Sequence, residues 1–248
     1  MKILIANPGY TPGYVSAFAQ AKAIQRHPEW EVHFYELSAS LLTWNFNSAW
    51  ATALNLKESH GLTHFLLIHA DVRPKGEDWL DVMLAEMERM QADVMSAIIP
   101  IKDQRGLTST ALDTDPWRPL RLTQRQVLTE FPETWTADEL LFNTGLLLVD
   151  LRKPWVEQVC FTMRDQIVRD DDGQWRAYVQ PEDWHFSRQC RALGVRAYVT
   201  RKVVVEHFGT GCWSSGQVWG EPVDQVNGAL VREKYDVAQI GAQHGKDE

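Results

Sequence analysis

The chain has 248 residues, of which 44% are hydrophobic and 23% are charged, and its formal net charge is −8. These proportions are typical of a folded globular protein and exclude a disordered or fibrous chain. The acidic balance argues against a surface built to hold polyanions, although Arg118, Arg121 and Arg125 form a short basic cluster that is either a solvated face or a local nucleic-acid contact.

The first apolar run of the chain is stopped at Pro8 and is too short for the core of a signal peptide, so we expect it to form a first strand. No later stretch approaches the roughly 18 consecutive apolar residues that cross a bilayer, and no membrane anchor is predicted. An odd number of cysteines without metal-type spacing favours reduced thiols and a cytoplasmic location. The cysteines are Cys160, Cys190 and Cys212.

Strand patterns alternate with helical patterns through the first hundred residues, which predicts βαβ units and an α/β fold with a mainly parallel central sheet flanked by helices. The predicted strands are 2–7, 30–35, 64–69 and 93–99. Two sets of apolar residues fall on single helical faces between these strands and predict helices that pack on the sheet. They are Tyr14, Phe18, Ala21 and Ile24, and Trp79, Met83, Met87 and Met90.

The periodicity fades between residues 100 and 136, which predicts a long functional loop with a hairpin or a short helix inside it. The pattern then predicts a strand at 146–149, a helix from Pro154 to Ile167, a turn at 170–173, a helix at 182–192, and strands at 195–200 and 203–207. Without a repeat, linker or break in composition, we expect residues 1–248 to form one domain, with a core at about 2–209 and a tail at 210–248.

Four short motifs carry the candidate chemistry. His69-Ala70-Asp71 follows a buried strand, and Asp71 there either caps the turn or faces a crevice where a carboxylate holds Mg²⁺ or Mn²⁺. Glu182-Asp183 opens a helix, where acids are expected from the helix dipole and where one of them also suits a general base. The other two motifs are Asn143-Thr144-Gly145 before a strand and Glu206-His207 at the end of one, each of which has an ordinary structural explanation when taken alone.

Taken together and in this order, the four motifs resemble the GT-A glycosyltransferases, with family 2-like enzymes as the nearest type, over residues 2 to 209. The resemblance implies that Asp71 and His207 bind a divalent ion, Mn²⁺ or Mg²⁺, beneath the donor diphosphate. His69 stands where the family carries an acid, and it either contacts the donor or adds a metal ligand, since Mn²⁺ accepts imidazole. The resemblance further implies that Asp183 is the catalytic base and that Glu182 lies nearer the substrate hydroxyls.

The same resemblance places the remaining candidate residues around the two substrates. Pro8 and Tyr10 follow the first strand and would line the nucleotide, and Asn47 lies where relatives carry an Arg-Asn pair. Phe46 replaces that arginine, so Arg73 or Lys102 would have to balance the phosphate charge. The acceptor side would include the Asn143-Thr144-Gly145 loop and Trp184, Trp213 or Trp219 as rings that stack on a sugar, and the donor sugar would meet 99–103 and 108–110.

These inferences predict a metal-dependent transfer of a sugar, from a UDP-sugar or another nucleotide sugar, to an acceptor hydroxyl, with inversion at the anomeric carbon. The acceptor is left open between a saccharide, a protein, a lipid-linked sugar and, less favoured by the acidic charge, a modified base in DNA. Two other classes stay as alternatives. They are a nucleotidyltransferase, for which the chain has no glycine-rich phosphate loop with a lysine after its first strand, and a non-catalytic nucleotide- or carbohydrate-binding protein.

Overall fold

The computed structural model describes residues 1–9, 15–209 and 211–217. Its central sheet has seven strands, five of which run in one direction while β10 and β8 run in the other. The α/β prediction is therefore confirmed, with a sheet that is mixed rather than wholly parallel. In spatial order the strands are β2 (Glu31–Ser38), β1 (Lys2–Gly9), β3 (His64–Ile68), β10 (Leu146–Asp150), β5 (Val94–Ala97), β13 (Ala197–Thr200) and β8 (Thr134–Trp135).

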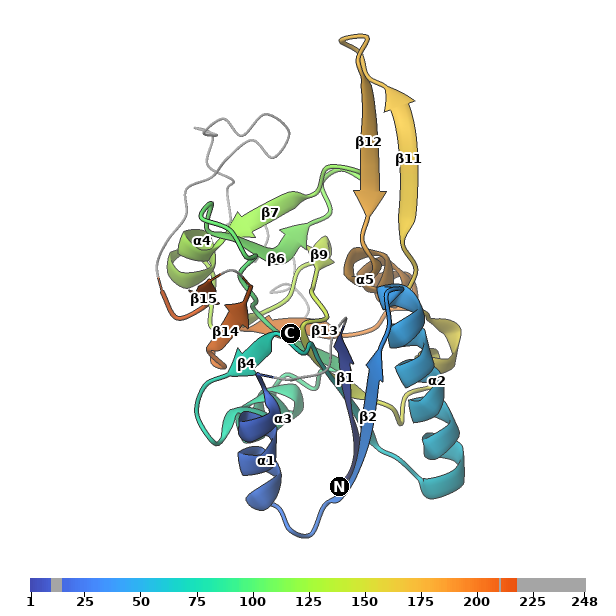
Figure 1. Ribbon diagram of the computed structural model, residues 1–248, viewed down its shortest axis with the longest axis vertical. Coiled ribbons are helices and arrows are strands. Elements are labelled where there is room, and N and C mark those ends of the chain that lie inside the picture. Colours follow the sequence, from blue (N-terminus) through green and yellow to red (C-terminus); the bar gives the residue numbers. More distant parts are fainter. Residues whose placement is uncertain (10–14, 210, 218–248) are drawn as a thin grey trace, which may run out of the picture.

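Helices cover both faces of this sheet because successive side chains of a buried strand point to opposite sides. Ile3 and Ile5 pack with α1 (Ala17–Gln25) and α3 (Trp79–Arg89), whereas Leu4 packs on the other face with α2 (Leu42–His60). Figure 1 shows α1 and α3 on one side of β1 and α2 on the other. The N-terminal strands are thus buried on both faces, as their continuous apolar runs predict.

Residues 100–136 contain a hairpin and also a short helix, which the sequence predicts as alternatives inside the long loop. β6 (Leu107–Leu112) and β7 (Leu120–Thr123) form an antiparallel pair, which β9 (Leu140–Leu141) extends to three strands. α4 (Gln124–Thr129) follows directly, because the Thr123 side chain accepts from the Gln126 N–H and completes a capping box. This sheet stands above the carboxyl ends of the central strands (Figure 1).

The helix predicted from Pro154 to Ile167 is wrong. Pro154 begins only a short 3-10 helix, η1 (Pro154–Gln158), and the chain then extends into β11 (Arg164–Arg169), which pairs with β12 (Trp175–Gln180) around the predicted 170–173 turn. The apolar spacing in the sequence imitated a helical stripe, but Met163 and Ile167 are 46% and 72% exposed and face no core. An exposed strand carries no burial signal that would distinguish it from a helix.

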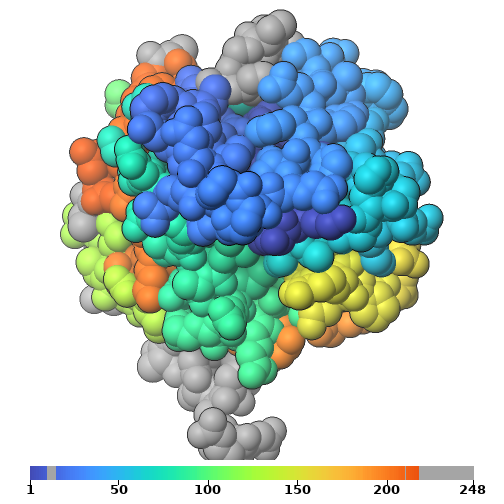
Figure 2. All heavy atoms as spheres, turned by 90° about the horizontal axis from the view of Figure 1, so that it is seen from below, coloured from blue at the N-terminus to red at the C-terminus, as the bar shows by residue number. Residues whose placement is uncertain are grey.

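The view from below and the strand directions together locate the carboxyl ends of the central strands. Figure 2 views the molecule from below, where the blue to green segments of the first hundred residues make up most of the visible surface, beside the yellow segment beyond residue 150. The carboxyl ends of β1, β3 and β5 lie at the opposite end of the sheet.

Among the described residues, no helix is long and apolar enough to cross a membrane, and the three cysteines form no disulfide.

Candidate functional site

A cavity of about 430 Å³ opens at the carboxyl edge of the central sheet. The ends of β1, β3 and β5 lead into it, and β10 starts from it because Leu146 pairs with Ile68. Crevices at this edge are where open α/β sheets bind ligands. Ten of the predicted site residues line the cavity, namely Pro8, His69, Asp71, Lys102, Asn143, Thr144, Gly145, Glu182, Asp183 and His207.

His207 reaches Asp71 through a strand pairing that the sequence pattern does not reveal. The predicted strand at 203–207 does not join the central sheet; β14 (Val205–Phe208) instead lies between β15 (Cys212–Ser214) and β4 (Val72–Pro74). The register sets His207 opposite Val72, and the Phe208 N–H donates to the Asp71 carbonyl at 2.8 Å. The last residue of the HAD motif and the late histidine therefore lie side by side.

The orientation of the His207 ring is set by the backbone. Its Nδ1 lies 2.7 Å from the Pro100 carbonyl, which accepts only, so Nδ1 carries a proton and donates. Nε2 then points toward Asp71, 3.5 Å from its Oδ2. A carbonyl that fixes one ring nitrogen and frees the other is the usual arrangement around a metal-binding histidine. The Asp71 and His207 donors thus fit a divalent cation that completes its coordination with substrate oxygens.

Lys102 supplies a positive charge to the same carboxylate, with its Nζ 2.5 Å from Asp71 Oδ2. Burial of Asp71 opposes its ionisation, but the contacts with His207 and Lys102 outweigh burial and hold the pKa of Asp71 below its usual range. Of the two predicted phosphate partners, only Lys102 lines the cavity. Arg73 instead donates from Nε to Glu206 at 2.9 Å.

His69 is held as a neutral imidazole at the base of the cavity. Burial lowers its pKa to about 4, and its ring lies 5.1 Å from the ring of Phe46. Within the described ranges, no three His, Cys, Asp or Glu side chains come together as a group that would hold a metal ion. The structure therefore does not join His69 to Asp71 and His207 as a third ligand; its Nε2 lies 3.5 Å from the Thr144 hydroxyl.

Glu182 and Asp183 approach the cavity from the first turn of α5 (Glu182–Ala192), which begins at the predicted residue. The Ser187 hydroxyl donates to the Phe142 carbonyl and accepts from the Phe142 N–H, both at 3.1 Å, which ties α5 to the segment before β10. Burial and the neighbouring charge of Glu182 raise the pKa of Asp183 to about 7, and burial raises the pKa of Glu182. A carboxyl group that titrates near neutral pH suits proton transfer.

Arg121, on β7, is a site residue that the sequence analysis missed. Its guanidinium lies 4.3 Å from the ring centre of Trp184, and its positive charge opposes the rise in the pKa of Asp183. In the sequence Arg121 belongs to a basic cluster, but the structure divides that cluster, because Arg118 donates to Asp170 on another element. No pattern in the sequence distinguishes Arg121 from its basic neighbours.

The Asn143-Thr144-Gly145 loop is shaped by Asn143, which is 2% exposed. Its amide donates to the Ala97 carbonyl at 2.7 Å and its oxygen accepts from the Gly145 N–H at 3.0 Å. The asparagine side chain is therefore committed to the protein. A Cβ on Gly145 would lie 2.6 Å from Ile99 Cδ1, so glycine permits a close approach between two cavity walls.

Four residues predicted to belong to the site lie away from the cavity or outside the described residues. Both polar atoms of Asn47 bind the Phe161 backbone, at 2.7 and 2.8 Å, and Asn47 does not line the cavity. Trp184 is 4% exposed, donates to the Ser109 carbonyl at 3.2 Å and does not line the cavity, so its ring is not free to stack on a sugar. Tyr10 and, in the tail, Trp219 fall outside the described residues.

Two of the segments predicted to meet the donor sugar contribute only in part. From segment 99–103, Ile99 and Lys102 line the cavity, and from segment 108–110 only Ser109 does. Thr108 and Thr110 on either side are fully buried, as expected for a strand whose alternate side chains point to opposite faces.

No protein-family model matches the chain, and no curated protein matches it by sequence. The structure is similar to the crystal structure of A197 from STIV, with a TM-score of 0.54 and 14% identity over 95% of this chain and 100% of that one. At that identity the likeness shows a shared fold and nothing of activity.

Two other solved structures match less well. A glycosyltransferase involved in the glycosylation of the major capsid of PBCV-1 has a TM-score of 0.29 and 12% identity over 62% of this chain and 63% of that one. The inositol-1-phosphate CTP transferase from T. maritima has a TM-score of 0.42 and 8% identity over 84% and 88%. The A197 match is therefore the one on which the comparison of folds rests.

Proposed function

We propose that the chain is a glycosyltransferase that moves a sugar from a nucleotide-sugar donor to an acceptor hydroxyl. The observation that carries the proposal is that two chemically opposite groups share one cavity. Asp71, His207 and Lys102 form a site for a cation and phosphate oxygens, and Glu182 with Asp183 forms a site for proton removal. A displacement at an anomeric carbon needs both groups at once, because the leaving diphosphate gains negative charge while the attacking hydroxyl loses its proton.

Asp71 and His207 are the residues that would hold Mn²⁺ or Mg²⁺. When bound, such an ion supplies positive charge to the leaving diphosphate. Lys102 contributes a second positive charge, because its ammonium group needs to move only from the Asp71 carboxylate to a phosphate oxygen. The resemblance to family 2-like GT-A enzymes supports this assignment of Asp71 and His207.

Asp183 would take the proton of the acceptor hydroxyl as that oxygen attacks. Its raised pKa makes it a better base than an ordinary aspartate while leaving it about half ionised near neutral pH. Direct attack of this kind inverts the anomeric configuration, and a retained configuration in the product would sink this part of the proposal. Glu182 would lie beside the substrate hydroxyls, and its charge helps to raise the pKa of Asp183.

The test uses the full chain, a panel of UDP-sugars and other nucleotide sugars, and Mn²⁺ or EDTA. We expect Mn²⁺-dependent donor binding by calorimetry in wild type and in Asp183→Asn, and its loss in Asp71→Ala. We expect slow release of nucleoside diphosphate in wild type and at least about a hundredfold less in Asp183→Asn. Glu58→Gln, on the exposed side of α2, is the control that leaves both measurements unchanged.

Each outcome separates the competing functions. Binding without turnover under any acceptor would favour a nucleotide- or carbohydrate-binding protein. Release of inorganic diphosphate when a nucleoside triphosphate and a sugar phosphate replace the nucleotide sugars would favour a nucleotidyltransferase. Donor binding that is equal in Mn²⁺ and in EDTA, and that Lys102→Met abolishes, would show that the Lys102 ammonium rather than a metal ion binds the donor diphosphate. Failure of all donors to bind would overturn the proposal.

A further inference from the structure

The β11–β12 ribbon projects away from the rest of the molecule as an antiparallel pair of strands (Figure 1). Side chains that are paired across the two strands share a face. We call one set the outer face and the other the inner face. The outer face consists of Asp165, Ile167, Arg169, Trp175, Ala177 and Val179, and the inner face consists of Arg164, Gln166, Val168, Arg176, Tyr178 and Gln180.

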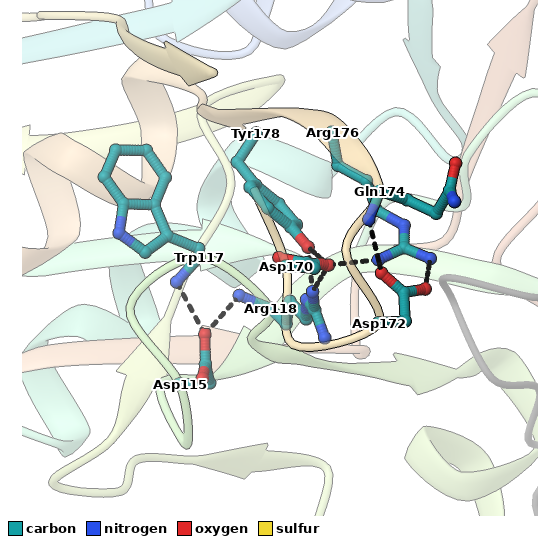
Figure 3. Close-up of polar contacts among 8 residues, drawn as sticks. All are labelled: Asp115, Trp117, Arg118, Asp170, Asp172, Gln174, Arg176 and Tyr178. Carbon is teal, nitrogen blue, oxygen red and sulfur yellow. Dashed lines mark hydrogen bonds and ion pairs between the residues drawn. The ribbon is translucent and has the colours of Figure 1, made fainter. Parts of the chain in front are cut away.

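Polar contacts hold the inner face against the body and fix the direction of the ribbon. Figure 3 shows Asp170, at the turn, accepting from Tyr178, Arg118 and Arg176, with the first two contacts at 2.5 Å. Arg118 in turn stacks on the Tyr178 ring at 4.8 Å, and Gln180 donates to the Pro116 carbonyl at 2.8 Å. The ribbon is thereby braced, and its outer face has a defined orientation.

All six residues of the outer face are exposed, although four of them are apolar. Ile167 is 72% exposed, Trp175 is 70% exposed and Val179 is 48% exposed. A two-stranded ribbon is marginally stable in water, and its apolar face normally packs on something. A contiguous apolar stripe on a braced arm is therefore expected to be a contact surface.

The charges on the outer face identify the partner. Asp165 lies at the base of the ribbon and Arg169 lies near the tip, two positions to either side of Ile167 on the same strand. Consider a two-fold axis that runs between the two outer faces, at the level of Ile167, parallel to the plane of the ribbon and perpendicular to its strands. This axis reverses the direction of the second ribbon and leaves β11 facing β11. Asp165 of each copy then meets Arg169 of the other, and the apolar residues meet one another.

We propose that the outer face of the β11–β12 ribbon packs against the same face of a second copy of this chain, in the antiparallel direction. The contact is isologous, as in most soluble dimers. The other face-to-face arrangement, with the two-fold axis along the strands, stacks β11 on β12 of the second copy and leaves both charges without an opposite partner. Charge complementarity thus selects the antiparallel packing.

The size of the face predicts how tight the dimer is. Stable interfaces cover about 800 Å² on each partner, and six strand residues provide less. The association is therefore expected to be reversible, with a dissociation constant on the order of micromolar. It concerns assembly alone and does not depend on the proposed reaction.

The experiment is sedimentation equilibrium of the full chain from about 1 to 200 µM. We expect a concentration-dependent dimer in wild type. Trp175→Thr, which keeps a residue suited to a strand, should raise the dissociation constant at least about tenfold, because large aromatic side chains carry much of the energy of an interface. Phe18→Thr is the matched control, since Phe18 is 71% exposed on α1 and lies outside the ribbon.

A charge exchange tests the direction of packing. Asp165→Arg alone and Arg169→Asp alone each place like charges opposite one another and should weaken the dimer about tenfold. The double substitution restores the pairing and should return the dissociation constant to near that of wild type. Far-UV circular dichroism checks that the ribbon variants fold.

Two results would overturn the proposal. The first is a wild-type chain that stays monomeric throughout the concentration range. The second is a dimer that Trp175→Thr leaves intact, or one in which the double charge exchange is as weak as the worse single variant.

Discussion

Asp183 combines a half-buried carboxyl with a close acidic neighbour, and the charge of Arg121 partly offsets both effects. This environment is costly for an ionised group. A protein that only needed to cap α5 would have no use for such a carboxyl at the wall of a cavity. The cost and the proposed catalytic role can be measured separately, because the first appears in stability and the second in turnover.

Replacing Asp183 with Asn removes the cost without removing the side chain's shape. Between the ordinary pKa of 3.8 and the raised value of about 7, the folded wild type keeps a proton that the unfolded chain releases, so its stability falls as pH rises across this window. We expect equal stability of the two proteins near pH 4 and a more stable Asn variant above pH 7, by on the order of 2 kcal/mol.

Urea unfolding at three pH values measures this difference, with Glu58→Gln as the control that should follow wild type. A constant difference between wild type and Asp183→Asn at all pH values would mean that Asp183 titrates like an exposed aspartate.

Arg121→Gln tests the influence of the half-buried guanidinium on the pKa of the proposed base, Asp183. Removing its positive charge should raise the pKa of Asp183, so the rise of kcat/KM with pH should move toward higher pH, by about one unit. The measurement is the pH profile of donor hydrolysis. Arg105→Gln is the control, because Arg105 pairs with Asp103 and its side chain is 48% exposed. A uniform loss of rate without a shift would make Arg121 a packing partner of Trp184 only.

At the scale of elements, the site depends on contacts between segments that no single element contains. β14 reaches the cavity because it pairs with β4, and the loop before β10 reaches it because Asn143 is bonded to the end of β5 at Ala97. Within that loop, Gly145 lets the backbone come close to Ile99. The close approach sets the distance between the wall that carries Thr144 and the wall that leads to Lys102.

A double-mutant cycle measures this approach. Gly145→Ala places a methyl group only 2.6 Å from Ile99 Cδ1 and should destabilise the protein by about 1–3 kcal/mol through overpacking. Ile99→Val removes that Cδ1 and alone should cost about 1 kcal/mol. The double variant should be more stable than the sum of the two losses predicts, as measured by urea unfolding. Strict additivity would show that the loop moves away without strain.

At the scale of the whole molecule, the sequence predicts what is local and misses what is paired at long range. The helix at 182–192 and the strands of the first hundred residues follow from hydrophobic periodicity and helix-start residues, which lie within a few positions of one another. Among the ten predicted residues that line the cavity, Pro8, His69, Asp71 and Lys102 lie at or just beyond the ends of strands that run in one direction and so end at one edge of the sheet, whereas the others were predicted from the resemblance to GT-A enzymes.

The errors have the opposite character. The pairing of His207 with Val72 joins residues far apart in the sequence, and the exposed ribbon has no buried face to impose a period of two. The inward position of Arg121 depends on the register of β7 with β6, which its basic neighbours conceal. The fold class and the site's position were thus predictable, whereas the partners of individual side chains were not.

One network joins the far edge of the central sheet to the helix layer. Glu86 of α3 is 5% exposed and accepts from Thr134 of β8 at 2.5 Å, from Lys202 at 2.6 Å and from Arg89 at 2.6 Å. The hydrogen bond from Arg89 outweighs the effect of burial, and the pKa of Glu86 is lowered to about 2. β8 has only two residues, so this carboxylate is a main anchor of the edge strand.

Glu86→Gln should therefore destabilise the whole molecule in a pH-dependent way. The ionised carboxylate stabilises the fold above its unfolded pKa of 4.5, and this contribution is lost as pH falls toward the folded value of about 2. We expect a loss of about 1–3 kcal/mol at neutral pH, because the buried donors lose a charged acceptor. The difference from wild type should shrink steadily below about pH 4.5. Urea unfolding at pH 7 and pH 3.5 measures it, with the exposed neighbour Glu88→Gln as control; a difference independent of pH would assign the loss to packing rather than charge.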